Sequence, residues 1–517
     1  MNMTRRDFMG SGSKAVLSTA FLPSFFSFLD EPSSFADDIL ESPRIKKIHQ
    51  YIQDHTTEHL AKIQADLRQP SVSSWNMGIQ EMAERMKESF KQLGCKEAEL
   101  VRTDGFPGVW GWYDAGAKKT ISHYMMYDTQ PFSEKEWSSS PLAANLVKMD
   151  PFPQVIIARG AINDKGPNRA FLNACEAILA VEGKLPVNLM FTCDGEEEQG
   201  SPNFHQVLAP YQDRLRTCNA HLGAGPSQNR EGFINMYLGN KGIAYVELES
   251  HGKHWGRGPQ KMPIHSSRKA ILDSPVWRLV KALSSMVDSA GNKILIDGFY
   301  DAIVPPTEEE EMLVNTLITK FGEKVFASER ENMKVWANDW TSVDAIRHLM
   351  FDTTLNIDGI WAGYTGEGSA TILPEKAQAK LDSRLVPNQV IDDQIKLLRQ
   401  HLDKHGFSDI GITKMGGGDE WSQTSVKAPV VRAVLSVYKH YGIEPAIWPR
   451  SAASSPQAQY TRAPINLAAC SGGLGHGGRA HAVDEYLVIE GNDRVAGLVQ
   501  MEQSIVDILY AYANWPE

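Results

Sequence analysis

The chain has 517 residues, with 63 acidic and 52 basic side chains, so its formal net charge is −11 at neutral pH. Apolar residues make up 42% and charged residues 22%, which excludes a disordered chain and is ordinary for a folded one. The acidic balance makes nucleic-acid binding a poor interpretation, and five Cys do not form a disulfide framework. The length allows about two to four domains.

The first residues have the pattern of an export signal. Arg5 and Arg6 form a paired arginine that resembles the twin-arginine signal, and residues 15–29 are apolar and free of acids. Cleavage after Ala36 suits the small residues there, and the apolar stretch is short for a transmembrane helix. We therefore expect residues 1–36 to be a twin-arginine signal peptide, with a disordered N-terminus as the alternative. The mature protein is expected to be periplasmic or otherwise extracytoplasmic, without a membrane segment.

The next part of the chain alternates between helical and extended patterns. Residues from about 40 to 95 carry apolar positions at three- and four-residue spacing, which predicts helix. A longer amphipathic run at residues 166–181 then predicts a helix. Short apolar runs predict strands at residues 99–102, 108–113, 120–127, 155–158 and 187–193. Strands that alternate with helices indicate a parallel α/β sheet.

Residues 246–415 have a different pattern, typical of an α+β domain. A strand is expected at 245–250, a helix near 275–287 and a strand near 377–385, and the last part of the chain returns to alternating helix and strand. The order indicates an α/β catalytic domain interrupted by an inserted α+β lid or dimerisation domain. The predicted boundaries are 37–245 and 416–517 for the catalytic domain and 246–415 for the insertion.

Four polar segments follow predicted strands and are rich in His, Asp, Glu and Gly. Ligands of α/β proteins gather at the carboxyl ends of strands, so these segments are the candidate site. Taken alone, a run of three Glu is more often a solvated surface, but the four runs together, in this order, are specific. They are Tyr127-Asp128-Thr129-Gln130-Pro131, Arg159 to Pro167, Asp194 to Ser201, and Gly477 to Tyr486.

The order and spacing of these runs resemble the co-catalytic zinc peptidases, a family that includes carboxypeptidase G, succinyl-diaminopimelate desuccinylase and the carnosine-type dipeptidases. The resemblance extends from about residue 45 to the C-terminus and is greatest for the dipeptidase branch. Further runs that match this branch are His254-Trp255-Gly256, Gly298-Phe299-Tyr300-Asp301, Ile357-Asp358-Gly359 and Arg384-Leu385-Val386-Pro387-Asn388.

The resemblance implies a two-zinc site, and this chain departs from it at three ligands. Met126 stands where the family has a His, Asn163 where it has the bridging Asp, and Ala224 where it has an Asp. Glu198 and His481 match the remaining ligands. The losses cover all the ligands of one ion, and a thioether is a poor substitute beside oxygen donors.

We therefore expect at most one zinc or similar divalent ion per chain, and possibly none. Glu198 and His481 are its predicted ligands, with Asn163 as a weak third donor. His123 and His221 could form a relocated site, but each lies three residues before a lost ligand, about 10 Å deeper along its strand and on the opposite face. Structural, partly buried histidines are the simpler interpretation.

The resemblance also assigns roles to residues outside the metal site. Glu197 is the predicted general base for water. In the family, the Asp that matches Asp128 orients the first ligand His; Asp128 has no such His to hold and is kept as a candidate catalytic residue. His254 is expected to stabilise the oxyanion, often from a partner subunit, and Arg384 to bind a substrate carboxylate. Lys165 is a further predicted substrate-binding residue, although packing at a helix start would explain it equally.

Three functions remain open from the sequence. The first is an exported hydrolase of amide bonds in small carboxylate-bearing substrates, either dipeptides or N-acyl amino acids, acting as a homodimer. The second is a metal-independent acid–base enzyme on the same fold, because crowded carboxylates without zinc acquire raised pKa values. The third is a non-catalytic protein that binds a ligand in the old cleft. The resemblance favours the hydrolase.

Overall fold

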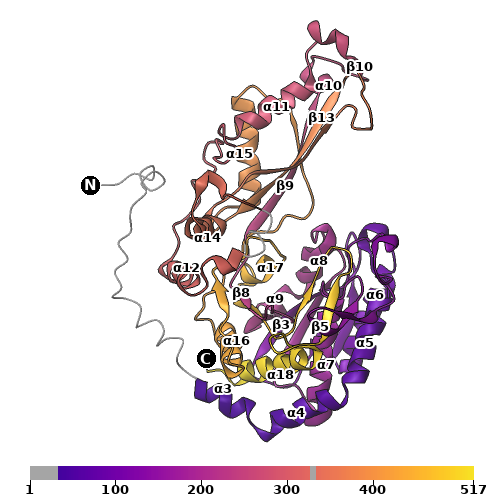
Figure 1. Cartoon of the computed structure of the whole chain (residues 1–517), viewed down its shortest axis with the longest axis vertical. Coiled ribbons are helices and arrows are strands. Elements are labelled where there is room, and N and C mark those ends of the chain that lie inside the picture. The colour runs from indigo at the N-terminus through magenta and orange to yellow at the C-terminus, as the bar shows by residue number, and fades with distance from the viewer. Residues whose placement is uncertain (1–32, 327–332, 517) are drawn as a thin grey trace, which may run out of the picture.

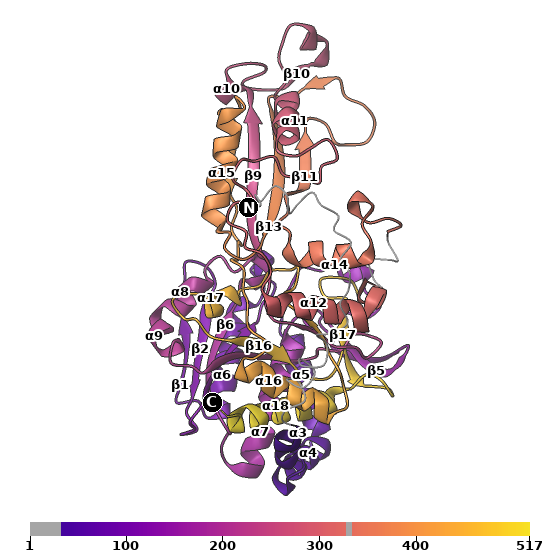
Figure 2. The same ribbon diagram turned by 90° about the vertical axis from the view of Figure 1, so that its left-hand side faces the viewer.

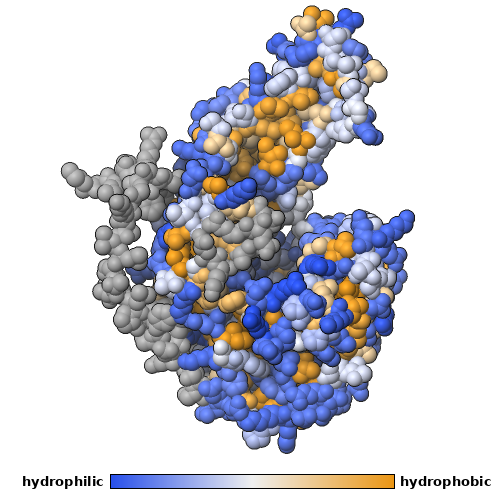
Figure 3. Space-filling view, viewed as in Figure 1, coloured by the Kyte–Doolittle hydropathy of each residue, from blue (hydrophilic) through white to orange (hydrophobic). Residues whose placement is uncertain are grey.

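The computed structural model describes residues 33–326 and 333–516, and residues 1–32 of the predicted signal peptide (1–36) lie outside them. The described chain forms a larger body and a smaller, elongated body joined by long strands (Figure 1, Figure 2). Figure 3 shows an open notch between the two bodies. Among the described helices, none is both long and apolar enough to cross a membrane.

A six-stranded sheet forms the centre of the larger body. Its strands, in order across the sheet, are β1 (Glu97–Val101), β2 (Gly108–Tyr113), β6 (Asn188–Asp194), β3 (Thr120–Met126), β7 (Ala220–Ala224) and β16 (Ala469–Gly472). The four strands from β6 to β16 are parallel, as expected, and β1 runs in the same direction, but β2 runs antiparallel to both of its neighbours, β1 and β6. The short link between β1 and β2 permits only a hairpin, since a parallel crossover needs a dozen or more residues.

One face of this sheet is covered by the main helical layer. It consists of α3 (Ser33–Leu40), α4 (Pro43–Asp54), α5 (Thr56–Arg68), α6 (Ile79–Leu93), α7 (Lys165–Glu182), α16 (Pro429–His440) and α18 (Leu498–Asn514). The predicted helical stretch from 40 to 95 is therefore three helices, broken at His55 and between residues 69 and 78. The predicted cleavage point at Ala36 falls inside α3, where that side chain is buried.

Helix α6 shows why the sequence pattern predicts this layer. Its apolar side chains recur every three or four residues, and those at Ile79, Met86 and Phe90 are buried against the sheet. Gly94 ends the helix with φ of 91°, a left-handed conformation that glycine adopts without strain. Phe90 stacks on Phe191 of β6 with ring centroids 4.6 Å apart.

The opposite face carries short helices and a smaller core. These helices are α8 (Phe204–Leu208), α9 (Gln212–Leu215) and α17 (Ala458–Thr461). Beside the central sheet, a four-stranded sheet pairs β17 (Gly477–Gly478), β18 (Tyr486–Glu490), β5 (Phe152–Ile157) and β4 (Asn145–Met149). It contains the strand predicted near residue 155 and joins two of the polar runs, which lie more than 300 residues apart in the sequence.

The smaller body is a four-stranded antiparallel sheet with two helices on it. The strands, in order, are β11 (Asn356–Ala362), β13 (Lys376–Leu385), β9 (Gly242–His251) and β14 (Gly411–Lys414), and the helices are α11 (Pro275–Ser285) and α15 (Ile391–Lys404). These elements enclose a separate apolar core. At the far tip lie α10 (Gly252–Trp255), β10 (Ile264–His265) and β12 (Ile372–Leu373).

Two helices of the predicted insertion pack against the larger body. Helices α12 (Glu308–Lys320) and α14 (Ser342–Phe351) form a core with β15 (Ala446–Trp448), which pairs with β8 (Asn235–Tyr237). A buried ion pair between Glu310 and Arg450 crosses this contact. The described residues also form short 3-10 helices, which are Ser73–Trp75, Glu134–Glu136, Glu197–Gln199, Ala209–Tyr211, Ser266–Ala270, Gly322–Phe326 and Ala337–Asp339.

Candidate functional site

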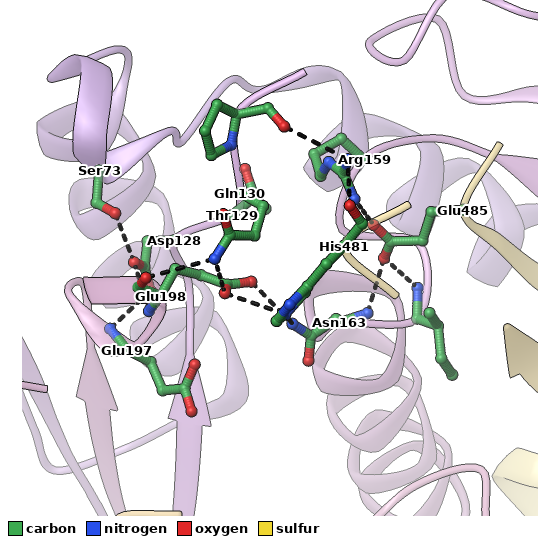
Figure 4. Close-up of polar contacts among 12 residues, drawn as sticks. Ser73, Asp128, Thr129, Gln130, Arg159, Asn163, Glu197, Glu198, His481 and Glu485 are labelled. Carbon is green, nitrogen blue, oxygen red and sulfur yellow. Dashed lines mark hydrogen bonds and ion pairs between the residues drawn. The ribbon is translucent and has the colours of Figure 1, made fainter. Parts of the chain in front are cut away.

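The acidic run after β6 forms a tight turn at the carboxyl end of the central sheet. Asp128, which follows β3, lies beneath this turn and is fully buried. Its carboxylate accepts the backbone N–H groups of Glu197 and Glu198 at 3.1 Å each and the hydroxyl of Ser73 at 2.7 Å (Figure 4). Gly195 is required here because a Cβ would collide with the ring of Tyr127. Asp128 therefore positions the acidic turn and does not line the cavity.

The surviving ligand candidates are hydrogen-bonded to one another. The Nδ2 atom of Asn163 donates to Glu198 at 2.8 Å and lies 3.0 Å from Nε2 of His481. Glu198 and His481 are themselves 3.1 Å apart, and Gln130 donates to the same carboxylate at 2.8 Å (Figure 4). The contact with Glu198 raises the pKa of His481.

A buried ion pair braces the two loops that carry these residues. Nη1 of Arg159 lies 2.7 Å from Glu485, and both side chains are almost wholly buried. The other oxygen of Glu485 accepts the backbone N–H groups of Ile162 and Asn163 at 3.0 and 2.9 Å. Glu485 thus holds the backbone of Asn163 in place and connects the loop of Asn163 to the loop that carries His481.

The three residues that replace metal ligands converge on a cavity of about 430 Å³. Met126 and Ala224 line it from the ends of β3 and β7, and Asn163 from the loop after β5. None of these three is an anionic or imidazole donor. Among the described residues, no group of three or more His, Cys, Asp and Glu side chains is arranged to hold a metal ion.

The donor set therefore does not fit a two-ion centre. What remains is one carboxylate, one imidazole and one neutral amide, from Glu198, His481 and Asn163. The Nδ2 atom of Asn163 points toward Glu198 and His481. The amide would have to rotate so that its oxygen points toward them before Asn163 could coordinate an ion. Such a set suits a single ion, weakly held.

His123 and His221 are more deeply buried than the sequence indicated, and both reach the cavity. Strands β3 and β7 pair only as far as Ser122 and His221, so the cavity enters between them beyond that point. The ring of His123 stacks on Phe171 of α7, and that of His221 stacks on Tyr460 of α17. The two rings thus pack against opposite layers. Burial lowers the pKa of His123 to about 4 and that of His221 to about 3.

The acids around the cavity repel one another. Burial, followed by the charges of Glu198 and Asp128, raises the pKa of Glu197 to about 9. Burial and the charge of Glu485 raise the pKa of Asp164 to about 7. Burial also raises the pKa of Asp128 to about 8, although the Ser73 hydroxyl opposes this shift. A cation in the cavity would lower the pKa values of Glu197, Asp164 and Asp128 and so favour their ionised forms.

Arg384 lies where the smaller body meets the larger one. It is near the end of β13, paired with Ile243 at the start of β9, and its guanidinium lies 3.3 Å from the hydroxyl of Ser454. The next residues of that loop, Ser455 and Gln457, line the cavity. The structure thus brings Arg384 to the loop that borders the cavity.

Two predicted residues are not at the cavity of this chain. His254 follows β9 at the tip of the smaller body, about 30 Å from the start of that strand at 3.3 Å per residue. Lys165 is buried and is not part of the cavity lining. Its ammonium donates a hydrogen bond to the backbone carbonyl of Gln69 at 2.6 Å. Burial lowers the pKa of Lys165 to about 8. Packing at the start of α7 accounts for Lys165 better than substrate binding.

Sequence reasoning did not identify several residues of the site. Tyr124 and Tyr460 both line the cavity and belong to the smaller core, where each packs against Phe204. Ser73 and Glu485 form hydrogen bonds that hold the loops of the site. Glu485 had a usable signal, because it lies in the same polar run as His481 and follows it by four residues. Tyr124 had none, because it lies within an apolar strand pattern.

Comparison with known proteins supports the fold and the family. A model of the M20 peptidase dimerisation domain matches residues 238–409. The solved structure of an M20 family metallo-carboxypeptidase from Sulfolobus solfataricus is 32% identical, with a TM-score of 0.77, covering 88% of this chain and 99% of that one. The structure of the Saccharomyces cerevisiae di-peptidase Dug1p shares the fold, with 22% identity, a TM-score of 0.74 and coverage of 92% and 99%.

Characterised proteins are also similar to this chain in sequence. The Cys-Gly metallodipeptidase DUG1 of Candida albicans is 26% identical over 380 residues, which is 68% of this chain and 73% of that protein. The human Beta-Ala-His dipeptidase is 27% identical over 428 residues, which is 78% of this chain and 80% of that protein. These findings confirm the predicted family, fold class and class of enzyme, a metallopeptidase-type hydrolase. The chain belongs to the M20 peptidase family.

Proposed function

We propose that this protein hydrolyses the amide bond of small substrates that carry a free carboxylate, with short peptides as the class. The observation that carries the proposal is the pairing of Glu197 on one side of the cavity with Arg384 beside the loop on the other. The relatives, which are named as dipeptidases and a carboxypeptidase, support the same class.

The reaction uses the residues in distinct ways. Arg384 binds the substrate carboxylate through two parallel N–H groups, which fixes the amide bond over the cavity. Glu197 takes a proton from the attacking water and gives it to the leaving amine, so that no net proton is consumed by the protein. Asp128 holds the turn that carries Glu197, through the backbone bonds described above.

The protein is proposed to hold at most one divalent ion, zinc or a similar metal. Glu198 and His481 would hold it, with the amide oxygen of Asn163 as a third donor. When bound, such an ion lowers the pKa of a water molecule beside Glu197. The loss of anionic donors at Met126, Asn163 and Ala224 supports an occupancy below that of a two-ion peptidase.

A second candidate function is metal-independent acid–base chemistry in the same cavity. It is favoured by one observation, that Asn163, Glu198 and His481 already satisfy one another by hydrogen bonds where an ion would lie. A protein that only binds a ligand in this cavity is the remaining alternative, and it would show saturable binding without turnover.

The decisive experiment measures metal content and hydrolysis on the same preparation. The full chain, made in its natural host and purified without chelator, is analysed for metals and assayed on a panel of dipeptides and N-acyl amino acids. Our proposal expects at most one ion per chain and turnover that is lost in Glu197→Gln.

Each other outcome selects an alternative. Activity that survives EDTA but not Glu197→Gln selects metal-independent chemistry. No activity in the natural chain, but activity in a Met126→His, Asn163→Asp, Ala224→Asp variant, would reject the hydrolase and show that the ancestral site can be rebuilt.

The protein is further proposed to act as a homodimer. The M20 dimerisation domain matches the smaller body, and β11 forms an unpaired edge of its sheet with Ile357, Ile360 and Trp361 exposed. Figure 3 shows apolar residues gathered on this body. Because His254 is far from the cavity of its own chain, a partner would have to supply it. An Ile360→Arg variant is expected to be monomeric by sedimentation; an unchanged dimer would reject this edge as the interface.

Export by the twin-arginine route remains a proposal from the sequence. Replacing Arg5 and Arg6 with Lys is expected to retain the protein in the cytoplasm of a bacterial host, as judged by cell fractionation. If the natural chain and the Lys variant were distributed equally between cytoplasm and periplasm, the export proposal would be refuted.

A further inference from the structure

The cavity that replaces the first metal site is open and has a defined wall. Its volume is about 430 Å³, and it lies where β3 and β7 separate at the carboxyl edge of the sheet. Ala224 and the neighbouring glycines leave space there, and Met126 forms an apolar side. The space is large enough for an organic group of several heavy atoms, such as an amino-acid residue.

The wall of this cavity carries acceptor atoms that have no donors. Among the described residues, the carboxylates of Glu197 and Asp164 accept no hydrogen bond, and Asp164 does not cap α7 although it occupies the N-cap position. Asn163 donates through Nδ2 and leaves its Oδ1 without a partner. Figure 4 shows the carboxylate of Glu197 and the amide oxygen of Asn163 directed to the same side, away from the hydrogen-bonded network.

Among the described residues of the cavity lining, none carries a fixed positive charge, although the neighbouring His481 acts to lower the pKa of Asp164. Within the part of the chain that the structure describes, no Lys or Arg lines the cavity, and burial lowers the pKa of His123 and His221 so that both rings are neutral. The Nδ1 atom of His123 is 2.6 Å from the carbonyl of Leu222, so its proton is on that side and its other nitrogen is an acceptor. The hydroxyl oxygen of Tyr124 is buried at the wall and has no hydrogen-bond partner.

We propose that this cavity binds an organic primary ammonium group in the place of the lost first metal ion. An ammonium offers three N–H donors and a positive charge, which match the acceptors of Glu197, Asp164 and Asn163. A metal ion fits less well, because these groups do not form a set of three His, Cys, Asp or Glu donors. A neutral ligand offers no positive charge to these two acidic side chains.

Resting on the proposed function, this inference narrows the substrate class. Arg384 binds the carboxyl-terminal end of the substrate, so the opposite end reaches the cavity and its free amino group becomes the bound ammonium. The substrates are then unblocked short peptides, and N-acyl amino acids, which have no such charge, are excluded.

The test compares binding of free and blocked peptides, independently of turnover. The full chain, treated with EDTA and dialysed, is titrated in a calorimeter with Ala-Ala, Leu-Gly and Phe-Gly and with the N-acetyl form of each. Loss of one hydrogen-bonded charge is expected to weaken binding by about 10- to 100-fold on acetylation. Equal affinity of the two forms would overturn the inference.

Substitutions test whether Asp164 and Glu197 cause the preference for peptides with a free amino group. Asp164→Asn and Glu197→Gln keep the shape of the side chains and remove one charge each, so each is expected to reduce the preference for the free peptide. Affinity for the acetylated peptides should change little. A preference that is unaltered in both variants would assign the ammonium to some other site.

A tethered cation gives a second measurement that needs no ligand. Ala224→Lys introduces an ammonium into the cavity, whereas Ala224→Met introduces a neutral chain of similar bulk. The Lys variant is expected to melt at a higher temperature than the Met variant and to bind no free peptide. A Lys variant that is less stable than the Met variant would overturn the inference.

Failure of this inference can be told apart from failure of the proposed function. Binding that prefers free peptides, without turnover, would reject the hydrolase and keep the ammonium site. Turnover of free and N-acetyl substrates at equal KM would keep the hydrolase and reject the ammonium site.

Discussion

Replacing Glu485 with Gln tests the brace that holds the site together. In the natural protein, the Arg159 guanidinium lies 2.7 Å from one oxygen of Glu485, and their side chains are only 4% and 1% exposed. The other oxygen accepts two backbone N–H groups, from Ile162 and Asn163. A glutamine retains that acceptor but turns an amide toward Arg159, so the variant removes the counter-charge and little else.

The expected cost follows from the burial of the remaining charge. Removing one partner of a buried ion pair costs about 3–5 kcal/mol, because the other charge remains desolvated. The ring of Trp137, 5.0 Å from the guanidinium, replaces only part of the lost interaction. Glu485→Gln should therefore lower the free energy of unfolding of the larger body by roughly that amount and loosen the loop of Asn163.

The measurement is urea denaturation, with hydrogen exchange of residues 159–165 as a local readout. The matched control is Arg159→Met combined with Glu485→Gln, which removes both charges and should recover about half or more of the loss. A loss below about 1 kcal/mol in Glu485→Gln alone would refute the reasoning, as would a double variant less stable than the single one.

Three further predictions follow from other parts of the molecule. His221 is buried and neutral, so unfolded chains bind more protons below its ordinary pKa, and the contribution of His221 to stability should fall by about 1.4 kcal/mol per pH unit between about pH 6 and pH 4. The buried carboxyls of the site contribute in the opposite direction, so the measurement is the difference in unfolding free energy between the natural chain and His221→Phe, which should change by that amount per pH unit; a difference that does not vary with pH would refute the assignment. Arg384→Met should raise KM by about 10- to 100-fold for peptides with a free carboxylate and leave amidated peptides unaffected, a split that a purely structural role would not give. Phe90 is fully buried against Phe191, so Phe90→Ala should cost about 3–5 kcal/mol in urea unfolding, and a cost near zero would mean that the helix repacks.

Much of the fold could be predicted because periodicity and length are local properties. The strands at β2, β3 and β6 and the helix α7 lie where the apolar patterns predict them, since each buries a face whose spacing is visible in the sequence. The antiparallel edge formed by β1 and β2 was not foreseen, because pairing direction depends on where the connection runs. The contact of α12 with β15 was likewise hidden, because it joins residues far apart in the chain.

The site divides in the same way. The loss of donors at Met126, Asn163 and Ala224 could be read from residue identity alone, since no fold can make them anionic. The buried position of Lys165 and the distance of His254 from the cavity could not, because residue identity does not fix the direction of a side chain or the length of the strand that carries it.

By itself, the sequence determined which segments are helix or strand, the family, and which ligand types are missing. The tertiary structure decided where the empty space lies, since β3 and β7 part only after Ser122, and which residues brace it, since Arg159 and Glu485 are 326 residues apart. The physical reason is that local patterns follow from neighbours along the chain. A cavity and a buried charge pair depend on which distant segments the packing brings together.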